Sequence, residues 1–370
     1  MYNPIFQVHE FTGIPYAKPP VGPLRLSSPQ PHILPSIINA TNPGNLCPAL
    51  NQQLEVTGAE DCLTLDIFIP GDSSPRIVKP KPLYPVLVWF VGEGLDGPRD
   101  NVYPVQLVAH HKLIIVVVRY RSGPLGFLHH SIFGDNLTEK IGNIGLLDQR
   151  EALRWVSEYI EEFGGDSGRV TVMGQSITAS YLLAHVKDLY KTSFHQMILH
   201  GSPMSSSFSY WTDSQSNDIT SALLDKIDCG GESTLACLRE RSVEEILRAN
   251  NHITKSKSIW DSHWRPTVGS PLLDNSLHNI LRSVFLPPML LGSNAAEGGM
   301  FSPRESEESL ESVISGNPVF SQRNDNAQNF VNFQYAPSLK GDDDWQSRVD
   351  FVGDSLINCP TNSLADLVSR

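Results

Sequence analysis

The 370-residue sequence predicts one large α/β domain with a mostly parallel central sheet flanked by helices. Two continuous runs of apolar, largely β-branched residues, at 86–91 and 113–118, are typical of strands covered on both faces. Shorter strand-like segments follow at 169–173, 197–199 and 289–291, and helix-like segments separate several of these strands. This alternation predicts a doubly wound sheet, and no clear linker divides the chain.

The elements around these strands are predicted from period and composition. The first seventy residues are rich in Pro and Gly and are expected to form irregular strands and loops. A crossover helix is predicted at 148–163, because Ala152, Leu153, Val156 and Ile160 form an apolar stripe at helical spacing. A further helix is expected from Ile177 to about Val186, and a short one near 306–314.

Charge and hydropathy exclude several classes of function. The formal net charge of -12 and the lack of a long Lys/Arg run argue against a surface for nucleic acid or anionic membrane. The acidic run 342–344 lacks the spacing of calcium ligands, so we interpret it as a solvated loop and expect no metal or cofactor. Apolar stretches reach six or seven residues, far from the roughly 20 of a membrane-spanning helix. We expect no span within this chain.

The five cysteines form two closely spaced pairs, Cys47 with Cys62 and Cys229 with Cys237, and leave Cys359 alone. Such pairs favour disulfides in an oxidising compartment. Zinc is the alternative, but no pair has the two-residue spacing of a zinc knuckle.

Two glycosylation sequons begin at Asn39 and Asn136 and suit a secreted protein, although such triplets also arise by chance. The N-terminus, from Met1 to Ile5, shows no signal peptide, which by itself would suggest the cytosol. Because the cysteines and sequons indicate secretion, we interpret the missing signal as a missing piece.

The segment that carries the most chemistry is Gly174-Gln175-Ser176-Ile177-Thr178, at the end of a predicted strand and the start of a predicted helix. This is the setting of a nucleophile elbow, in which a strained turn exposes the serine hydroxyl. The N–H of the following residue, Ile177, would then point at a developing oxyanion. Ser176 is therefore the candidate nucleophile.

The surrounding sequence resembles the type-B carboxylesterases and cholinesterases over nearly the whole chain. Motifs in the family's order carry the resemblance: FTGIPYAKPPVG at 11–22, EDCLTLDI at 60–67, YRSGPLGF at 120–127, GNIGLLDQ at 142–149 and FGGD at 163–166. It implies one α/β-hydrolase domain across residues 1–370, incomplete at both ends. It also implies four side-chain pairings: the disulfides Cys47–Cys62 and Cys229–Cys237, and the ion pairs Arg25–Glu60 and Arg121–Asp166.

The resemblance makes Glu297 the acid of the catalytic triad, whose order along the chain is Ser, acid, His. No histidine follows Glu297. The match ends near Cys359, upstream of the family's catalytic-His segment, so we expect the domain to be truncated before that segment and the partner of Cys359 to lie downstream. By position in the sequence, His195, His200 and His263 stay open as substitute bases, but His195 and His200 flank the strand after the elbow helix and have no family precedent.

Three supporting positions depart from the family. The oxyanion segment reads Val91-Gly92-Glu93-Gly94, so the candidate oxyanion residues are Gly92, Glu93, Gly94 and Ile177, with an anionic side chain in place of a glycine. If Glu93 points inward it should oppose the transition state; if it points to solvent it costs little. Thr178 replaces the last elbow glycine, where a β-branched residue should strain the turn. The family's Ser-Gly pair reads Gly201-Ser202.

Two functions from different classes follow. The first is a carboxylic ester hydrolase that acts on a small ester through Ser176 without a cofactor; the loop 47–62 has no Trp, which makes a choline ester a poor substrate. The second is a catalytically silent protein that uses the fold to bind a protein partner. A product that never folds stably is a third interpretation. We expect these 370 residues to be a poor enzyme, and the family suggests secretion.

Overall fold

The computed structural model describes most of the chain. The described residues are 1–33, 35, 37–51, 53–71, 83–94, 97–98, 102–133, 141–188, 194–204, 209–231, 233–254, 264–304, 309–317, 325–336 and 343–369. For residues 93–94, 97–98, 325 and 327 only the backbone is described.

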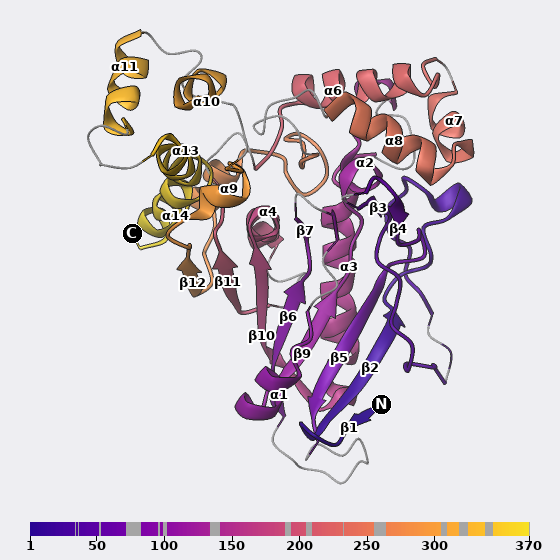
Figure 1. The fold of residues 1–370 in the computed structure, drawn as a ribbon. Coiled ribbons are helices and arrows are strands. Elements are labelled where there is room, and N and C mark those ends of the chain that lie inside the picture. Colours follow the sequence, from indigo (N-terminus) through magenta and orange to yellow (C-terminus); the bar gives the residue numbers. More distant parts are fainter. Residues whose placement is uncertain are drawn as a thin grey trace.

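An eight-stranded sheet forms the centre of the molecule, in the order β1-β2-β5-β9-β6-β10-β11-β12 (Figure 1). Its strands are β1 (Tyr2–Asn3), β2 (Val8–Pro15), β5 (Thr64–Pro70), β6 (Tyr84–Phe90), β9 (Ile114–Val118), β10 (Gly165–Gln175), β11 (Gln196–His200) and β12 (Met289–Gly292). Strands β9, β6, β10, β11 and β12 are parallel, whereas β1, β2 and β5 pair antiparallel. The predicted mostly parallel α/β sheet is confirmed.

Two short ribbons lie outside this sheet. They are β3 (Ala49–Leu50) with β4 (Val56–Thr57), and β7 (Glu93–Gly94) with β8 (Gly97–Pro98).

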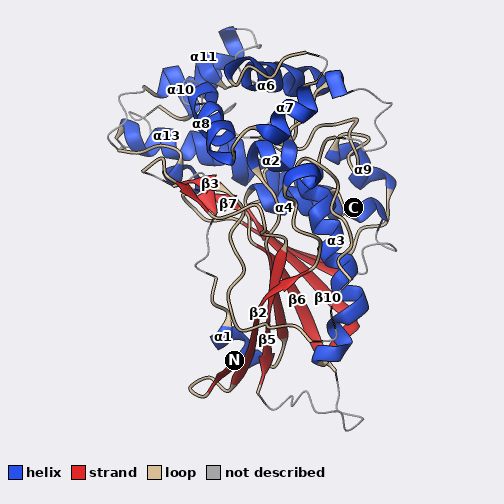
Figure 2. Ribbon diagram, turned by 90° about the vertical axis from the view of Figure 1, so that its right-hand side faces the viewer, coloured by secondary structure: helices blue, strands red, loops and turns tan. Residues whose placement is uncertain are grey.

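Helices cover both faces of the sheet. On one face, α3 (Ile144–Tyr159) packs over the main apolar core, which contains Val86, Val88 and Phe90. On the other face, α1 (Val105–His111) packs against Leu87, which belongs to β6 like Val86, Val88 and Phe90. Figure 2 shows the two helices on opposite sides of the strands. Alternate side chains of β6 therefore enter different cores, and this explains its continuous apolar sequence.

The remaining helices gather mainly above the carboxyl ends of the parallel strands (Figure 1). They are η1 (Gly22–Leu24), α2 (Gly123–Phe127), η2 (Ser131–Phe133), η3 (Ile160–Phe163), α4 (Ile177–Leu183), η4 (Val186–Asp188), α6 (Asp213–Lys226), α7 (Thr234–Glu240), α8 (Val243–Thr254), α9 (Leu277–Ser283), η5 (Glu297–Met300), α10 (Leu310–Gly316), α11 (Asp325–Gln334), α13 (Asp344–Gly353), the π-helical turn η6 (Asp354–Asn358) and α14 (Cys359–Val368). Among the described helices, none combines the length and apolarity needed to cross a bilayer.

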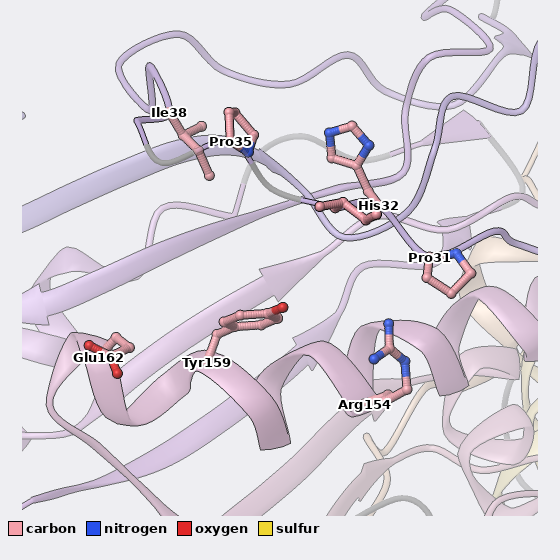
Figure 3. Close-up of a pocket in the computed structure, with 8 residues that line it drawn as sticks. Pro31, His32, Pro35, Ile38, Arg154, Tyr159 and Glu162 are labelled. Carbon is pink, nitrogen blue, oxygen red and sulfur yellow. The ribbon is translucent and has the colours of Figure 1, made fainter.

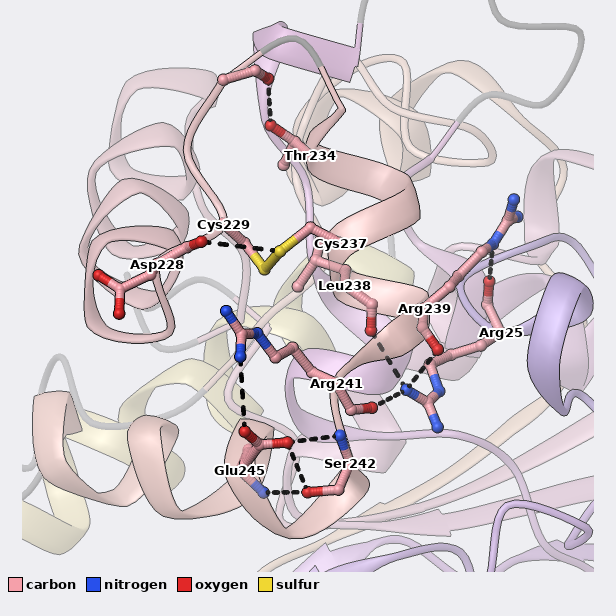
Figure 4. The surroundings of a disulfide bond; sticks show 11 residues. Arg25, Asp228, Cys229, Thr234, Cys237, Leu238, Arg239, Arg241, Ser242 and Glu245 are labelled. Carbon is pink, nitrogen blue, oxygen red and sulfur yellow. Dashed lines mark hydrogen bonds and ion pairs between the residues drawn. A yellow bond between two sulfur atoms is a disulfide. The ribbon is translucent and has the colours of Figure 1, made fainter.

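The Cys229–Cys237 disulfide joins the segment after α6 to α7, next to a junction with the N-terminal region (Figure 4). Arg25 makes this junction: it binds Glu60 through two hydrogen bonds of 2.6 and 2.7 Å and also donates to the carbonyl oxygen of Leu238 at 3.2 Å. The expected Arg25–Glu60 ion pair is therefore confirmed, and it also anchors α7.

The Cys47–Cys62 disulfide is also present, and Cys359 is free and exposed.

The expected ion pair between Arg121 and Asp166 is wrong. The Arg121 guanidinium instead binds Asp148 of α3 at 2.7 and 2.8 Å, and Asp148 is fully buried. Asp166 binds Arg169 at 2.6 Å. The reason is topological: Arg121 follows the carboxyl end of β9, whereas Asp166 lies at the amino end of β10. Because both strands run parallel to β6, these positions lie at opposite edges of the sheet, about 20 Å or more apart.

Candidate active site

Ser176 occupies the turn between β10 and α4 and has φ 55° and ψ −131°. A positive φ is costly for a residue with a Cβ, so the surrounding structure must hold it in place. The Ser176 N–H donates to the His200 carbonyl at 2.7 Å, and the Ser176 carbonyl accepts from the Ala179 N–H at 3.0 Å. Ser176 as a whole is partly exposed, and its hydroxyl has no hydrogen-bond partner among the described residues. The predicted strand-turn-helix setting of Ser176 is thus present.

Glu297 begins η5, shortly after the end of β12. Its carboxylate accepts from the Asn294 N–H at 2.7 Å and from the Asn294 side-chain amide at 3.2 Å. Gly201, directly after β11, has φ +61°, and a Cβ placed there would lie 3.1 Å from the Glu297 carboxylate. The carboxylate therefore packs against the exit of β11.

Packing on α13 places the turn that carries Glu297. A Cβ on Gly298 would lie 2.0 Å from the Val349 carbonyl oxygen and 2.6 Å from the Gly353 nitrogen. Only a glycine at 298 allows η5 to lie this close to α13. The C-terminal helix α13 thus supports the position of Glu297.

Ser176 and Glu297 lie at the same edge of the sheet, separated by one strand. Gln175 pairs with His200, and His200 pairs with Gly292, so β10, β11 and β12 end at one level. Two strand spacings correspond to about 10 Å between the ends of β10 and β12. An imidazole with a hydrogen bond at each nitrogen spans about 8 Å. The separation of the two strand ends is therefore of the same order as the span of one imidazole.

The candidate oxyanion residues approach the elbow from β6. Gly92 lies against Thr178, in the first turn of α4, while Ile177 is the first residue of that helix. Glu93 and Gly94 form β7, and the Glu93 side chain lies outside what the structure describes, so its predicted influence stays a prediction. Gly92 and Ile177 are thus close in space, as the predicted site requires.

The strain expected at Thr178 is wrong. Thr178 lies inside α4, does not have a positive φ and is fully buried. Its hydroxyl forms a hydrogen bond of 2.8 Å with the Tyr120 hydroxyl. The turn places its strain at Ser176, so a β-branched side chain two residues later is tolerated.

Ser202 is buried, and its hydroxyl lies 3.2 Å from the hydroxyl of Ser180 in α4. Its carbonyl accepts a hydrogen bond from the Thr361 hydroxyl of α14 at 3.2 Å. The altered Gly201-Ser202 pair therefore links the elbow helix to the C-terminal helix.

The three histidines considered as substitute bases differ in position. His195 lies at the amino end of β11, where its ring accepts a hydrogen bond from the Val170 N–H at 3.2 Å, so it is at the opposite edge of the sheet from Ser176. His200 ends β11 beside the elbow, but its side chain is exposed and has no hydrogen bond to Ser176 or Glu297 in the described structure. His263 lies outside the described residues.

The remaining sequence predictions concern the acidic run, metal ligands and the glycosylation sequons. Asp343 caps α13 by accepting from the Gln346 N–H at 2.8 Å, so part of the acidic run begins a helix instead of a loop. Within the described ranges, no group of three or more His, Cys, Asp or Glu side chains could hold a metal ion. Asn39 is exposed and its side chain accepts from the Thr41 N–H and hydroxyl, while Asn136 is outside the described residues.

A groove of 670 Å³ lies between the N-terminal loop and the C-terminal half of α3 (Figure 3). Tyr159 and Arg154 of the helix face Pro31 and His32 of the loop across it. Arg154 is already paired with two glutamates on its own helix. Because this end of α3 leads into the amino end of β10, the groove lies far from Ser176 and is not the candidate active site.

Sequence reasoning did not assign roles to Tyr120 or Asn294. Tyr120 was part of a matched motif, but nothing in the sequence pairs it with Thr178. Asn294 lies three residues before Glu297, a spacing at which a side chain can hydrogen-bond across a turn, and this signal could have been used.

Comparison of the amino-acid sequence with known proteins identifies the family of the chain. A sequence model described as the carboxylesterase family matches residues 2–370. The chain belongs to the carboxylesterase family. Its sheet and flanking helices agree with the α/β-hydrolase fold of that family.

Several members of the carboxylesterase family are similar to the chain at about 30% identity. The para-nitrobenzyl esterase of Bacillus subtilis (strain 168) is 30% identical over 83% of the chain and 64% of its own length. The cholinesterase of Mus musculus is 31% identical over 88% of the chain and 54% of its own length. The pyrethroid hydrolase Ces2e of Rattus norvegicus is 34% identical over 80% of the chain and 52% of its own length. The chain spans about half to two thirds of these relatives.

Proposed function

We propose that the protein is a carboxylic ester hydrolase in which Ser176 is the nucleophile. The observation that carries this proposal is the backbone of Ser176, with φ 55° and ψ −131° at the junction of β10 and α4. A strained serine at such a junction exposes its hydroxyl, and family membership together with esterase-named relatives supports ester chemistry.

In the proposed reaction, the Ser176 oxygen attacks the carbonyl carbon of a small ester while its proton passes to an imidazole. The N–H groups of Ile177 and of the segment 92–94 would stabilise the negative charge on the carbonyl oxygen. Glu297 would orient the imidazole, which then returns the proton to the departing alcohol. Water releases the acyl group by the same steps, and no metal or cofactor takes part.

The imidazole is the component that the described residues do not supply. No histidine follows Glu297, and none of the described histidines has its imidazole ring hydrogen-bonded to Ser176 or Glu297. We therefore propose that these 370 residues, with Ser176 as nucleophile and Glu297 as acid, hydrolyse esters only slowly. Added imidazole should partly replace the base, since about 10 Å separates the two strand ends.

The experiment is hydrolysis of a short-chain p-nitrophenyl ester by the folded chain, with and without imidazole, beside Ser176→Ala and Glu297→Gln. Subtracting the Ser176→Ala rate removes hydrolysis by imidazole itself. We expect Ser176-dependent turnover that rises with imidazole and falls in Glu297→Gln. Strong turnover without imidazole would refute the proposal that these residues lack a catalytic base. The next measurement would then be ester hydrolysis by His200→Gln, to test whether His200 is that base.

A catalytically silent binding protein is the second candidate function. The lack of a placed base and the Glu93 substitution in the oxyanion segment favour it. No Ser176-dependent turnover from a folded chain, with or without imidazole, would support this candidate and exclude the first. Under either candidate, we propose a secreted protein with glycans at Asn39 and Asn136, because the paired cysteines form disulfides.

A further inference from the structure

A buried side-chain contact lies behind the turn that carries Ser176. The hydroxyl of Tyr120, two residues after β9, lies 2.8 Å from the hydroxyl of Thr178 in α4. Thr178 is fully buried and Tyr120 is 4% exposed. A hydrogen bond shielded from water fixes the direction of the threonine hydroxyl, because the β-branched side chain has few rotamers.

Gly92 is packed directly onto this hydroxyl. A Cβ on Gly92 would lie 1.7 Å from the Thr178 hydroxyl oxygen, 3.0 Å from the Thr178 Cβ and 3.2 Å from the Tyr120 hydroxyl. No side chain fits in that space. The turn that follows β6 therefore lies against the first turn of α4, two residues after Ser176.

We propose that Thr178 is a positioning residue for the oxyanion segment: its hydroxyl, held by Tyr120, sets where Gly92 and the following N–H groups lie relative to Ser176. The catalytic consequence rests on the proposed function, whereas the structural coupling does not. Donors that stabilise an oxyanion act only when they are placed within hydrogen-bond distance of it, so a small displacement of Gly92 would weaken them.

The first test is whether residues 92 and 178 are coupled. In the protein with Thr178, Gly92→Ala should lower the melting temperature strongly, because the new methyl group would clash with the threonine side chain. The two nearest atoms are the Thr178 hydroxyl oxygen and Cβ. In Thr178→Gly those atoms are absent and only the end of Tyr120 remains near, so Gly92→Ala should cost much less there. Additive effects of the two substitutions would overturn the proposed coupling.

The second test is amide hydrogen exchange in the peptide that contains Gly92. Thr178→Val keeps the shape of the side chain but removes the hydroxyl, and should speed exchange in this peptide. Thr178→Ser keeps the hydroxyl and should restore slow exchange. Equal exchange in the valine and serine variants would contradict a role for the hydroxyl, whether or not the chain is an enzyme.

The third test links position to chemistry through the rate at which a fluorophosphonate labels Ser176 with imidazole present. We expect Thr178→Val to slow labelling by about tenfold or more and Thr178→Ser to stay near the wild-type rate. If Ser176 is never labelled, the proposed function fails while the exchange experiment still decides the coupling. If labelling is equal in both variants although exchange differs, the positioning role is refuted.

Discussion

His185 should make the stability of the protein depend on pH between about pH 7 and pH 5.5. The ring is fully buried after α4, and its Nε2 lies 2.9 Å from the side-chain oxygen of Gln149 in α3. Its Nδ1 has no hydrogen-bond partner in the described structure. Burial, reinforced by the charge of Arg150, lowers the pKa of His185 from 6.5 to about 3. The folded protein therefore holds this ring neutral.

The sign of the effect follows from comparison with the unfolded chain, where the histidine pKa is about 6.5. Below that pH the unfolded state binds a proton that the folded state does not bind, so stability is present above pH 6.5 and is lost as pH falls toward 3. The loss, RT ln(1 + 10^(6.5 − pH)), is about 0.2 kcal/mol at pH 7.0 and about 1.4 kcal/mol at pH 5.5. The wild type should lose about 1.2 kcal/mol over this interval through His185 alone.

The assay is urea denaturation at pH 7.0 and pH 5.5 with the disulfides intact. His185→Gln should have lower stability at pH 7.0, because a fully packed ring is replaced, but should lose about 1.2 kcal/mol less than the wild type on acidification. His278→Gln, at an exposed position on α9, is the control and should follow the wild type. An equal loss in the wild type and in His185→Gln would refute this reasoning.

Two further predictions use matched pairs of variants. Asp148→Asn should destabilise the fold by about 3 kcal/mol or more because it breaks a buried ion pair, whereas Asp166→Asn, whose partner is exposed, should cost much less by urea denaturation. Equal costs would contradict the assignment of the Arg121 partner. Gly298→Ala should disrupt the packing of η5 on α13, because its methyl group would lie 2.0 Å from the Val349 carbonyl oxygen, whereas Gly299→Ala meets no atom within 4 Å and should be neutral. Hydrogen exchange in the peptide that contains Glu297 would show the difference, and similar behaviour of both variants would refute it.

Much of the sheet could be predicted because burial on both faces leaves a strong local signal. Strands β6 and β9 appear in the sequence as apolar runs, and Ser176 stands between a strand and a helix in a recognisable turn. The predicted helix at 148–163 corresponds to α3 and η3. The strand β5 was expected to be irregular, yet all seven of its residues are buried. Its one charged residue, Asp66, is paired with Arg119, which lies 53 positions away in the chain.

What the sequence could not supply were contacts set by tertiary packing. The partner of Arg121 depends on which edge of the sheet a carboxylate occupies, and this requires the strand order. The tolerance of Thr178 depends on the strain being confined to Ser176, and on a tyrosine hydroxyl 58 positions away in the chain. The helices α6 and α8 were not predicted, although the Thr212 and Gln215 capping box marks the start of α6.

The most direct test of the central claim is to map where a fluorophosphonate probe attaches to the folded chain by mass spectrometry. We expect a single adduct on Ser176, formed faster with imidazole and absent from Ser176→Ala. No adduct on Ser176 under either condition, from a chain that is shown to be folded, would contradict the claim that this strained turn presents a nucleophile.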